Sequence, residues 1–303
     1  MFRQNLIVTM TQENATIQKV WDQQSIWSQS ANRLKVSVET ARSRALVLAV
    51  AAAVLGTASA QLMDWNARLG AALAFTAALA AGLSPLLAQR GGPGLMSDWI
   101  RTRAVSEALK GEVYACLAGV GPYADRASGA VLLAERASGF CVDATDLVRY
   151  TAGISAKARP LPPVVDLETY VDRRLRHQID SYYRPRAAWM QNRVELFTKT
   201  ELAFGIMGVL VAAAAGAFAL GDLAAWTGVI ASVSIAVTAH ATARRYTYQH
   251  LEFLRTAEEL KRLLDRWTAD SSTIGESADA FVSKCEHIIS IQNEAWMIRW
   301  TVG

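Results

Sequence analysis

The stretch from Leu202 to Ala243 constrains the fold more than any other, because it contains a single charged residue, Asp222. Its apolar runs, 202–220 and 223–243, are each about 20 residues long, and at about 1.5 Å per helical residue each matches a hydrocarbon layer of about 30 Å. A soluble core is not built from two runs of this length with almost nothing between them. The sequence therefore predicts a transmembrane helical hairpin.

An earlier part of the chain repeats this plan. Two uncharged runs, 45–63 and 69–89, are joined by the short loop from Asp64 to Arg68. The composition agrees with four spans, since 52% of the 303 residues are hydrophobic and only 19% are charged, as in a membrane protein with sizeable soluble parts. The predicted fold class is an all-α membrane protein with two tandem transmembrane hairpins and long helices that extend into a cytoplasmic bundle.

Basic residues indicate the orientation of both hairpins. The turn of the first hairpin holds only Arg68, and the turn of the second holds no Lys or Arg. Outside the spans basic residues are frequent: Arg33, Lys35, Arg42, Arg44, Arg90, Arg101, Arg103, Arg184, Arg186, Arg193, Lys199, Arg244, Arg245 and Arg255. The positive-inside rule then places both termini and the central region in the cytoplasm.

Two similar segments follow the hairpins and indicate a parallel duplication. Trp99 to Lys110 follows the first, and His250 to Lys261 follows the second, with Glu, Leu and Lys at the same positions. The expected organisation is a first repeat over 1–120, a linker with short helices over 121–163, and a second repeat over 164–303 with a final helix at its end. The Pro-rich segment Arg159 to Pro163 marks the boundary.

Long amphipathic helices are expected on either side of the hairpins. The first, Thr11 to Arg44, has a heptad-like seam at Ile17, Val20, Gln24, Trp27, Ala31, Leu34, Val38, Ala41 and Ala45. Such a seam needs a partner, which is either another helix of the same chain or a second chain in a coiled coil.

Three further stripes are predicted by the same spacing. The helix Asp166 to Lys199 has Leu167, Val171, Leu175, Ile179, Tyr182 and Trp189 on its apolar side, and Pro185 should kink it or end its first half. The helix after the second hairpin presents Leu251, Leu254, Ala257, Leu260, Leu264 and Trp267. After a break at Ser271 to Gly275, a last helix from about Glu276 to Trp300 presents Phe281, Cys285, Ile288, Gln292 and Ala295 or Trp296.

Several motifs resemble those of a known family. They are Trp27-Ser-Gln-Ser-Ala-Asn-Arg-Leu-Lys35, the segment Tyr170 to Tyr183, the return helix Arg255 to Lys261, and Glu294-Ala-Trp296. They are similar to two subtypes of the bacterial SLATT domain, a two-span effector domain associated with SMODS and SLOG proteins. The resemblance implies a multi-pass protein of the bacterial plasma membrane that acts as a membrane-perturbing or pore-forming effector in nucleotide-linked defence.

Catalytic chemistry has little support in the sequence. There is no GxSxG, HExxH or phosphate-cradling glycine loop, and no acidic pair lies inside a span. The histidines and cysteines are scattered without metal-ligand spacing: His177, His240, His250, His287, Cys116, Cys141 and Cys285. We expect no enzyme activity, no cofactor, no metal and no nucleic-acid partner, and we expect the cysteines to be reduced packing residues.

Small residues recur every four positions in each span. They are Ala52, Gly56 and Ala60; Gly70, Ala74, Ala78 and Gly82; Gly208, Ala212 and Gly216; Gly228, Ser232 and Ala236. Such stripes let helix backbones approach closely in lipid. They serve either the packing of the four helices within one chain or contacts between subunits of a homo-oligomer.

The fourth span carries most of the polar groups available inside the membrane, and its candidate pore-lining residues are Thr227, Ser232, Ser234, Thr238 and His240. In the alternative reading the hydroxyls bond to their own helix carbonyls and His240 lies near the interface. Asp64 and Asp222 would form an acidic outer rim that favours cations. Arg244 and Arg245 would flank the inner mouth or anchor lipid headgroups.

The sequence thus supports an oligomeric pore or ion channel, acting as a membrane-permeabilising effector gated through its cytoplasmic helices. The alternative is a non-conducting membrane-anchored scaffold or sensor that binds partners through those helices. A membrane enzyme would require a ligand or metal to co-purify. Expected partners are the lipid bilayer, further copies of the chain, inorganic ions, and a cytoplasmic regulatory protein or nucleotide signal.

Overall fold

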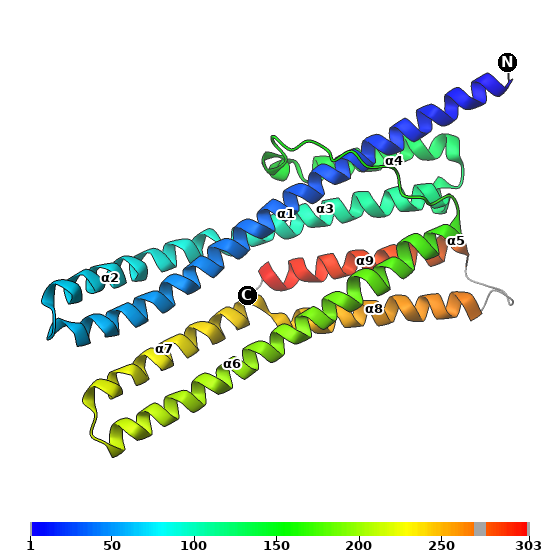
Figure 1. Cartoon of the computed structure of the whole chain (residues 1–303). Coiled ribbons are helices and arrows are strands. Elements are labelled where there is room, and N and C mark those ends of the chain that lie inside the picture. Colours follow the sequence, from blue (N-terminus) through cyan, green and yellow to red (C-terminus); the bar gives the residue numbers. More distant parts are fainter. Residues whose placement is uncertain (1, 270–276, 302–303) are drawn as a thin grey trace. The chain divides into compact units, whose positions relative to one another are not determined.

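The computed structural model describes the backbone of residues 2–269 and 277–301, and the side chains within 12–125, 128–242, 244–269 and 277–290. All regular structure in these residues is helical (Figure 1), which confirms the all-α class. The α-helices are α1 (Phe2–Met63), α2 (Ala67–Arg90), α3 (Pro93–Ala118), α4 (Arg126–Asp143), α5 (Leu167–Tyr170), α6 (Arg184–Ala217), α7 (Gly221–Arg244), α8 (Tyr246–Ala269) and α9 (Ala278–Thr301). Two 3₁₀ turns, η1 (Gly121–Tyr123) and η2 (Thr145–Tyr150), and two π-helical stretches, η3 (Val171–Arg176) and η4 (Gln178–Tyr183), complete the order.

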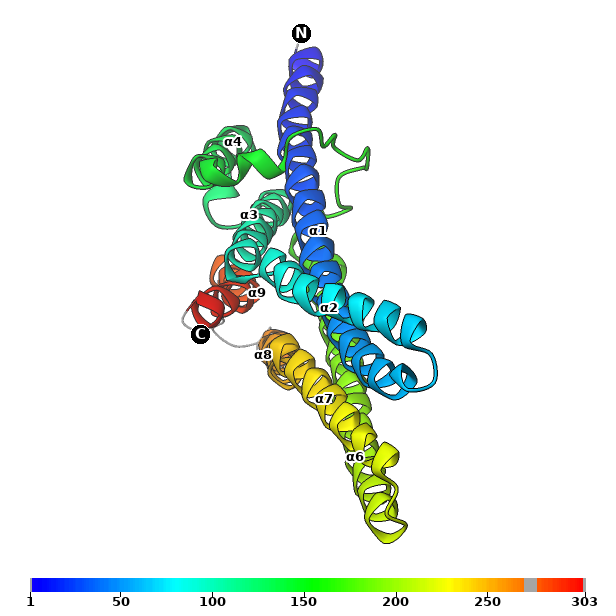
Figure 2. The same cartoon turned by 90° about the vertical axis from the view of Figure 1, so that its left-hand side faces the viewer.

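Four helical stretches of the described chain are long and apolar enough to cross a membrane, and each contains one predicted span. Figure 2 shows α2 returning beside α1 and α7 beside α6, so the spans form two hairpins. The first turn is tight because the side chain of Asn66 caps α2 by accepting a hydrogen bond from the backbone N–H of Leu69, at 3.2 Å. The prediction of four spans is confirmed by the length and composition of the helices.

The chain divides into two compact units that cut across the predicted repeats. The bundle unit contains residues 1–35, 93–187 and 252–303, and the hairpin unit contains residues 36–92 and 188–251. This grouping differs from the predicted order of first repeat, linker and second repeat. The reason is that α1, α6 and α8 each run from one unit into the other, so each sequence repeat contributes to both.

The seam of α1 packs within the chain. Its predicted positions Ile17, Val20, Gln24, Trp27, Ala31, Leu34, Val38 and Ala45 are buried, and Ala41 is half-buried. Inside the bundle unit the seam joins one core with Leu109 and Val113 of α3 and Leu133 of α4. The buried amide of Gln24, the one polar seam position, donates to the hydroxyl of Ser106 at 3.0 Å. The seam therefore packs against helices of the same chain and not against a second chain in a coiled coil.

The segment predicted as a linker is part of this core. In α4, in η2 and at Ala144 between them, the apolar residues Ala130, Leu133, Ala137, Ala144 and Leu147 are buried. The Pro-rich stretch is also fixed against α1, because the indole N–H of Trp21 donates to the carbonyl of Pro160 at 3.0 Å and the Arg159 guanidinium lies 3.6 Å from the Trp21 ring centroid. Residues 121–163 therefore pack in the bundle unit as well as joining the two predicted repeats along the chain.

The register of the second long helix differs from the prediction. Its buried apolar residues repeat every four positions, at Val171, Leu175, Ile179, Tyr183 and Ala187, whereas the predicted Tyr182 is half-buried and Trp189 is exposed. A four-residue repeat fits the wider turns of η3 and η4, not the 3.6-residue α-helical turn used for the prediction. Pro185 lies in the first turn of α6, where the pattern returns to α-helical, as its missing N–H allows.

The stripe on α8 agrees with the prediction at its centre and differs at its start. Ala257 and Leu260 are buried as predicted, together with Phe253, Thr256 and Leu263, whereas the predicted Leu251 and Leu254 are exposed. Before α8 the backbone of Arg245 takes a left-handed φ of 49°, which ends α7 and sets a new helical phase.

On α9, Phe281 and Cys285 are buried as predicted, and the ring of Phe281 stacks on Trp267 at 4.5 Å. Cys116 and Cys285 are buried and Cys141 is half-buried, and none of the three forms a disulfide in the part of the chain that the structure describes. The predicted break at Ser271 to Gly275 and the side chains of Gln292, Glu294, Ala295 and Trp296 lie outside the described residues.

Candidate functional site

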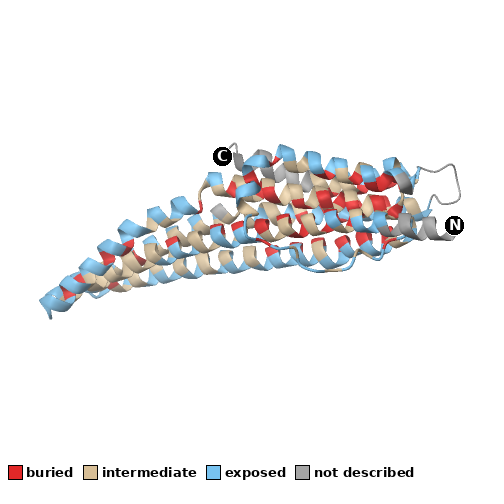
Figure 3. Cartoon of the chain, turned by 90° about the horizontal axis from the view of Figure 1, so that it is seen from above, coloured by how far each residue is buried: buried red, intermediate tan, exposed pale blue. Residues whose placement is uncertain are grey.

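The spans bury very little of themselves within one chain. In the most apolar window of each candidate helix only 6–11% of the residues are buried, and the hairpin helices are mostly tan and pale blue in Figure 3, whereas buried residues gather in the bundle unit. Large apolar side chains are exposed along the spans, among them Phe75, Leu79, Leu83, Leu202, Ile206, Val209, Leu210 and Ile235. This surface must contact lipid or other protein chains.

The candidate pore-lining residues of α7 do not share one face. At about 100° per residue, Thr227, Ser234 and Thr238 lie on one side of the helix, and Ser232 and His240 lie well away from them. In the structure Ser232 and Thr238 are exposed, whereas Thr227 and Ser234 are half-buried.

His240 occupies the packed side of α7. It is half-buried, and its ring centroid lies 6.2 Å from that of Phe197 on α6. His240 therefore does not lie on the side of α7 that carries Thr238, and the pore-lining role of the predicted residues stays a prediction. Thr242, one turn beyond Thr238, lies about 40° from it around the helix and is exposed. The sequence could have separated these residues, because two positions along a helix differ by about 200° in direction.

The tips of the hairpins carry the predicted acidic residues. Asp64 and Asp222 are both exposed. A hydrogen-bonded clip joins the tips: the amide N–H of Gln61 on α1 donates to the backbone carbonyl of Asp222 at 2.7 Å, and the indole N–H of Trp226 on α7 donates to the Gln61 side-chain oxygen at 3.0 Å. The Asp222 side chain takes no part in this clip, and it lies in the first turn of α7, where the helix dipole favours a negative charge.

The other ends of α1 and α7 are joined by an ion pair. The guanidinium of Arg244 lies 3.0 Å from the carboxylate of Glu39, and the Arg244 side chain is only 19% exposed. Arg245 follows as the left-handed residue that ends α7. The partner of Arg244 was not predicted from the sequence. Glu39 could have been proposed as that partner, because it is the last acidic residue before the first span.

A second polar site lies inside the bundle unit. The side chain of Arg174, on η3, is 1% exposed and forms two hydrogen bonds with the carboxylate of Glu286 on α9, at 3.0 and 2.8 Å. The hydroxyl of Tyr170 donates to the same carboxylate at 2.7 Å. A Cβ atom at Gly111 would lie 2.8 Å from the Glu286 carboxylate, so any larger residue there would have to displace that carboxylate. No local sequence pattern indicates these contacts.

The electrostatics of this site follow from burial. Burial alone would raise the pKa of Glu286, but the charge and hydrogen bonds of Arg174 outweigh it and hold that pKa below its ordinary value. Burial lowers the pKa of the nearby Lys110 to about 8, against the attraction of Glu107 and with the added repulsion of Arg174. The carboxylate of Glu286 also lines a cavity of about 370 Å³ with Glu112, Arg136 and Asp279. Among the described residues no group of three or more His, Cys, Asp or Glu could hold a metal ion.

Comparison with known proteins finds two family matches. Residues 170–296 match the SMODS and SLOG-associating 2TM effector domain 1, and residues 25–129 match a family described as a protein of unknown function, DUF4231. Each match covers a long helix, one hairpin and the helix that follows it. No curated protein and no solved structure matches the chain. The match over residues 170–296 includes the segment Tyr170 to Tyr183, one of the motifs on which the resemblance was based.

Proposed function

We propose that this chain, which has a SLATT-type 2TM effector domain over residues 170–296, permeabilises the membrane as an oligomeric pore. The pore lies in the bacterial plasma membrane with both termini in the cytoplasm, and it conducts cations. The protein has no catalytic role in this account, and its partners are lipid, further copies of itself and inorganic ions.

The exposed face of α7 carries the proposal. Thr238, Thr242 and Ser232 are exposed hydroxyl residues that together span an arc of about 120° around the helix, and no other helix of the described chain covers them. Gly228 lies between Thr242 and Ser232 on this arc, and a Cβ there would meet no atom within 4 Å, so close approach by another helix is open. In an oligomer with this face toward its centre, the hydroxyls contact water and not lipid. Uncharged hydroxyl groups can line an aqueous pore in this way.

Gating is assigned to the bundle unit. The π-helical stretches η3 and η4 continue without a break into α6, the third span. π-helical turns are rare and are frequently found at functional sites. A signal that changes the contacts of Arg174 and Glu286 would therefore act on a helix that itself enters the membrane. The expected signal is a cytoplasmic protein or a nucleotide.

The acidic rim gives a test of this function. In liposomes with a KCl gradient, the wild-type protein should pass K⁺ in preference to Cl⁻, because the exposed carboxylates of Asp64 and Asp222 concentrate cations at the outer end. Asp222→Lys should reduce or reverse this preference, as measured by the reversal potential, and Asp222→Asn should have an intermediate effect. The Gln61 clip uses only the backbone carbonyl of Asp222, so it survives both substitutions.

A matched control is Glu195→Lys, an exposed acidic residue of α6 that lies before the third span on the cytoplasmic side. It should leave the reversal potential unchanged. If liposomes that contain a well-folded oligomer show no ion flux with any variant, the pore is excluded and the non-conducting scaffold or sensor becomes the better account.

A further inference from the structure

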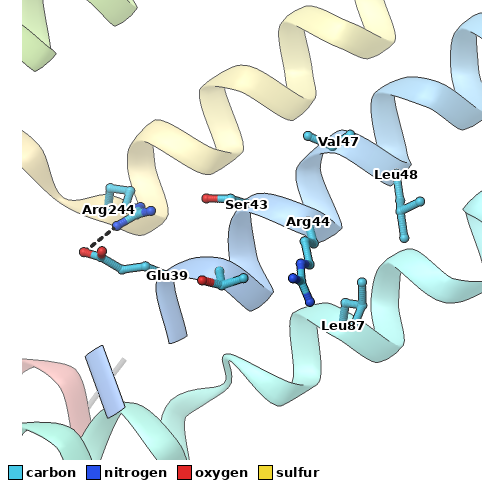
Figure 4. Close-up of a pocket in the computed structure, with 8 residues that line it drawn as sticks. Glu39, Ser43, Arg44, Val47, Leu48, Leu87 and Arg244 are labelled. Carbon is cyan, nitrogen blue, oxygen red and sulfur yellow. Dashed lines mark ion pairs between the residues drawn. The ribbon is translucent and has the colours of Figure 1, made fainter. Parts of the chain in front are cut away.

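An open groove of about 670 Å³ lies in the hairpin unit where α1, α2 and α7 meet, and Figure 4 shows its lining. It is lined by Glu39, Thr40, Ser43, Arg44, Val47, Leu48, Leu87 and Arg244. Arg44 extends from α1 toward Leu87 of α2, and Arg244 reaches from α7 toward Glu39 (Figure 4). The groove thus presents two guanidinium groups on residues from different hairpins.

The groove has a polar end and an apolar end, which matches the polar headgroup and apolar acyl chains of a phospholipid. Its polar members on α1, from Glu39 to Arg44, precede the first span, which begins at Ala45. Val47 and Leu48 lie inside that span, and Leu87 lies near the end of the second. Charged and hydroxyl groups therefore lie at the level of lipid headgroups, and the apolar wall begins where the hydrocarbon layer begins.

One donor in the groove is unsatisfied. The Nε atom of Arg244 is buried and has no hydrogen-bond acceptor in the part of the chain that the structure describes. A buried guanidinium N–H without an acceptor costs free energy, and a phosphate oxygen is the acceptor that suits it best. The guanidinium is held by Glu39 through another nitrogen, Nη1. The negative charge of Glu39 therefore repels a second anion that approaches the same guanidinium group.

We propose that this groove binds one anionic glycerophospholipid of the inner leaflet. The lipid phosphate contacts Arg44 and Arg244, its glycerol oxygens lie beside Thr40 and Ser43, and an acyl chain lies along Val47, Leu48 and Leu87. Because the phosphate and the Glu39 carboxylate repel each other at the same guanidinium group, the lipid loosens the ion pair that joins α1 to α7. This site does not depend on conduction and would exist in a scaffold as well.

The test is lipid binding by the purified full-length protein, measured by native mass spectrometry. Phosphatidylglycerol is titrated beside zwitterionic phosphatidylcholine, and soluble glycerol 3-phosphate is added as a competitor. Arg44→Ala and Arg244→Ala should each weaken phosphatidylglycerol binding roughly fivefold, the usual value of one basic residue near a lipid headgroup. Arg90→Ala, an exposed arginine at the end of α2 that does not line the groove, should leave binding unchanged.

Glu39→Gln gives a prediction of opposite sign. It keeps the size of the side chain and removes the competing charge, so phosphatidylglycerol should bind more tightly, whereas a purely structural ion pair would predict weaker binding or none. Arg44 is exposed and outside that ion pair, so its variant keeps the test valid if Arg244→Ala fails to fold. Equal losses for Arg90→Ala and Arg44→Ala, equal binding of the two lipids, or full competition by glycerol 3-phosphate would each overturn the proposal.

Discussion

Arg174→Met is expected to lower the free energy of unfolding of the bundle unit by about 3–5 kcal/mol, because it leaves the carboxylate of Glu286 buried without its counter-charge. The Arg174 side chain is 1% exposed and makes both of its hydrogen bonds to Glu286 at 3.0 Å or less. Methionine fills a similar volume, so the expected loss is electrostatic in origin and not a cavity effect.

Thermal unfolding of the full-length protein in detergent, followed by circular dichroism, measures this effect, and the midpoint should fall by about 10 °C. Arg173→Met is the matched control, since Arg173 is the neighbouring residue and its side chain is 62% exposed. The double variant Arg174→Met with Glu286→Leu should recover part of the loss, because both charges are then removed. Equal midpoints for the two single variants would show that the ion pair contributes nothing.

The same ion pair predicts a dependence on pH. Arg174 holds the pKa of Glu286 below its ordinary value. A carboxyl group with a depressed folded-state pKa contributes stability that is fully present above the unfolded pKa of about 4.3 and is lost as the pH falls through the folded pKa. The wild-type protein should therefore lose more stability than Arg174→Met when the pH is lowered from about 6 to 3. An unchanged difference between the two proteins across this range would contradict the assignment.

Thr238→Cys is expected to have the largest effect on conduction. In a background without Cys116, Cys141 and Cys285, a membrane-impermeant, positively charged thiol reagent should block most of the current, because Thr238 lies on the exposed hydroxyl face of α7. A bulky cation attached there fills the path and repels permeant cations. The measurement is the current across a bilayer before and after addition of the reagent.

Val209→Cys on α6 is the control for this experiment. Val209 is 69% exposed and lies in a span without a hydroxyl face, so its position is one for lipid contact. The reagent should leave the current of this variant unchanged. Equal block at both positions, or block at neither, would show that α7 does not line the path.

The parts of the fold that follow from simple periodicity could be predicted from the sequence. Apolar runs of bilayer length predicted all four spans because the hydrocarbon thickness leaves few alternatives. The α1 seam was predicted because a regular α-helix brings its positions to one side, and residues such as Trp27 and Leu34 are buried accordingly. The resemblance at Tyr170 to Tyr183 was confirmed by the family match over residues 170–296.

What could not be predicted depends on local departures from the α-helix and on contacts distant in sequence. The π-helical turns widen the helical repeat, so Tyr183 is buried where Tyr182 was expected. The contacts of Glu39 with Arg244 and of Arg174 with Glu286 join residues more than a hundred positions apart. No local pattern carries that information. The position of His240 is different, since helical geometry alone could have placed it away from Thr238.

The central claim is that the assembled hairpins conduct ions, and recording from the purified wild-type protein in a planar bilayer tests it most directly. The account predicts discrete current steps whose reversal potential in a KCl gradient lies toward that of K⁺, because the tips of the hairpins carry exposed Asp64 and Asp222. Electrical silence from an oligomer that is shown to be folded and inserted would contradict it.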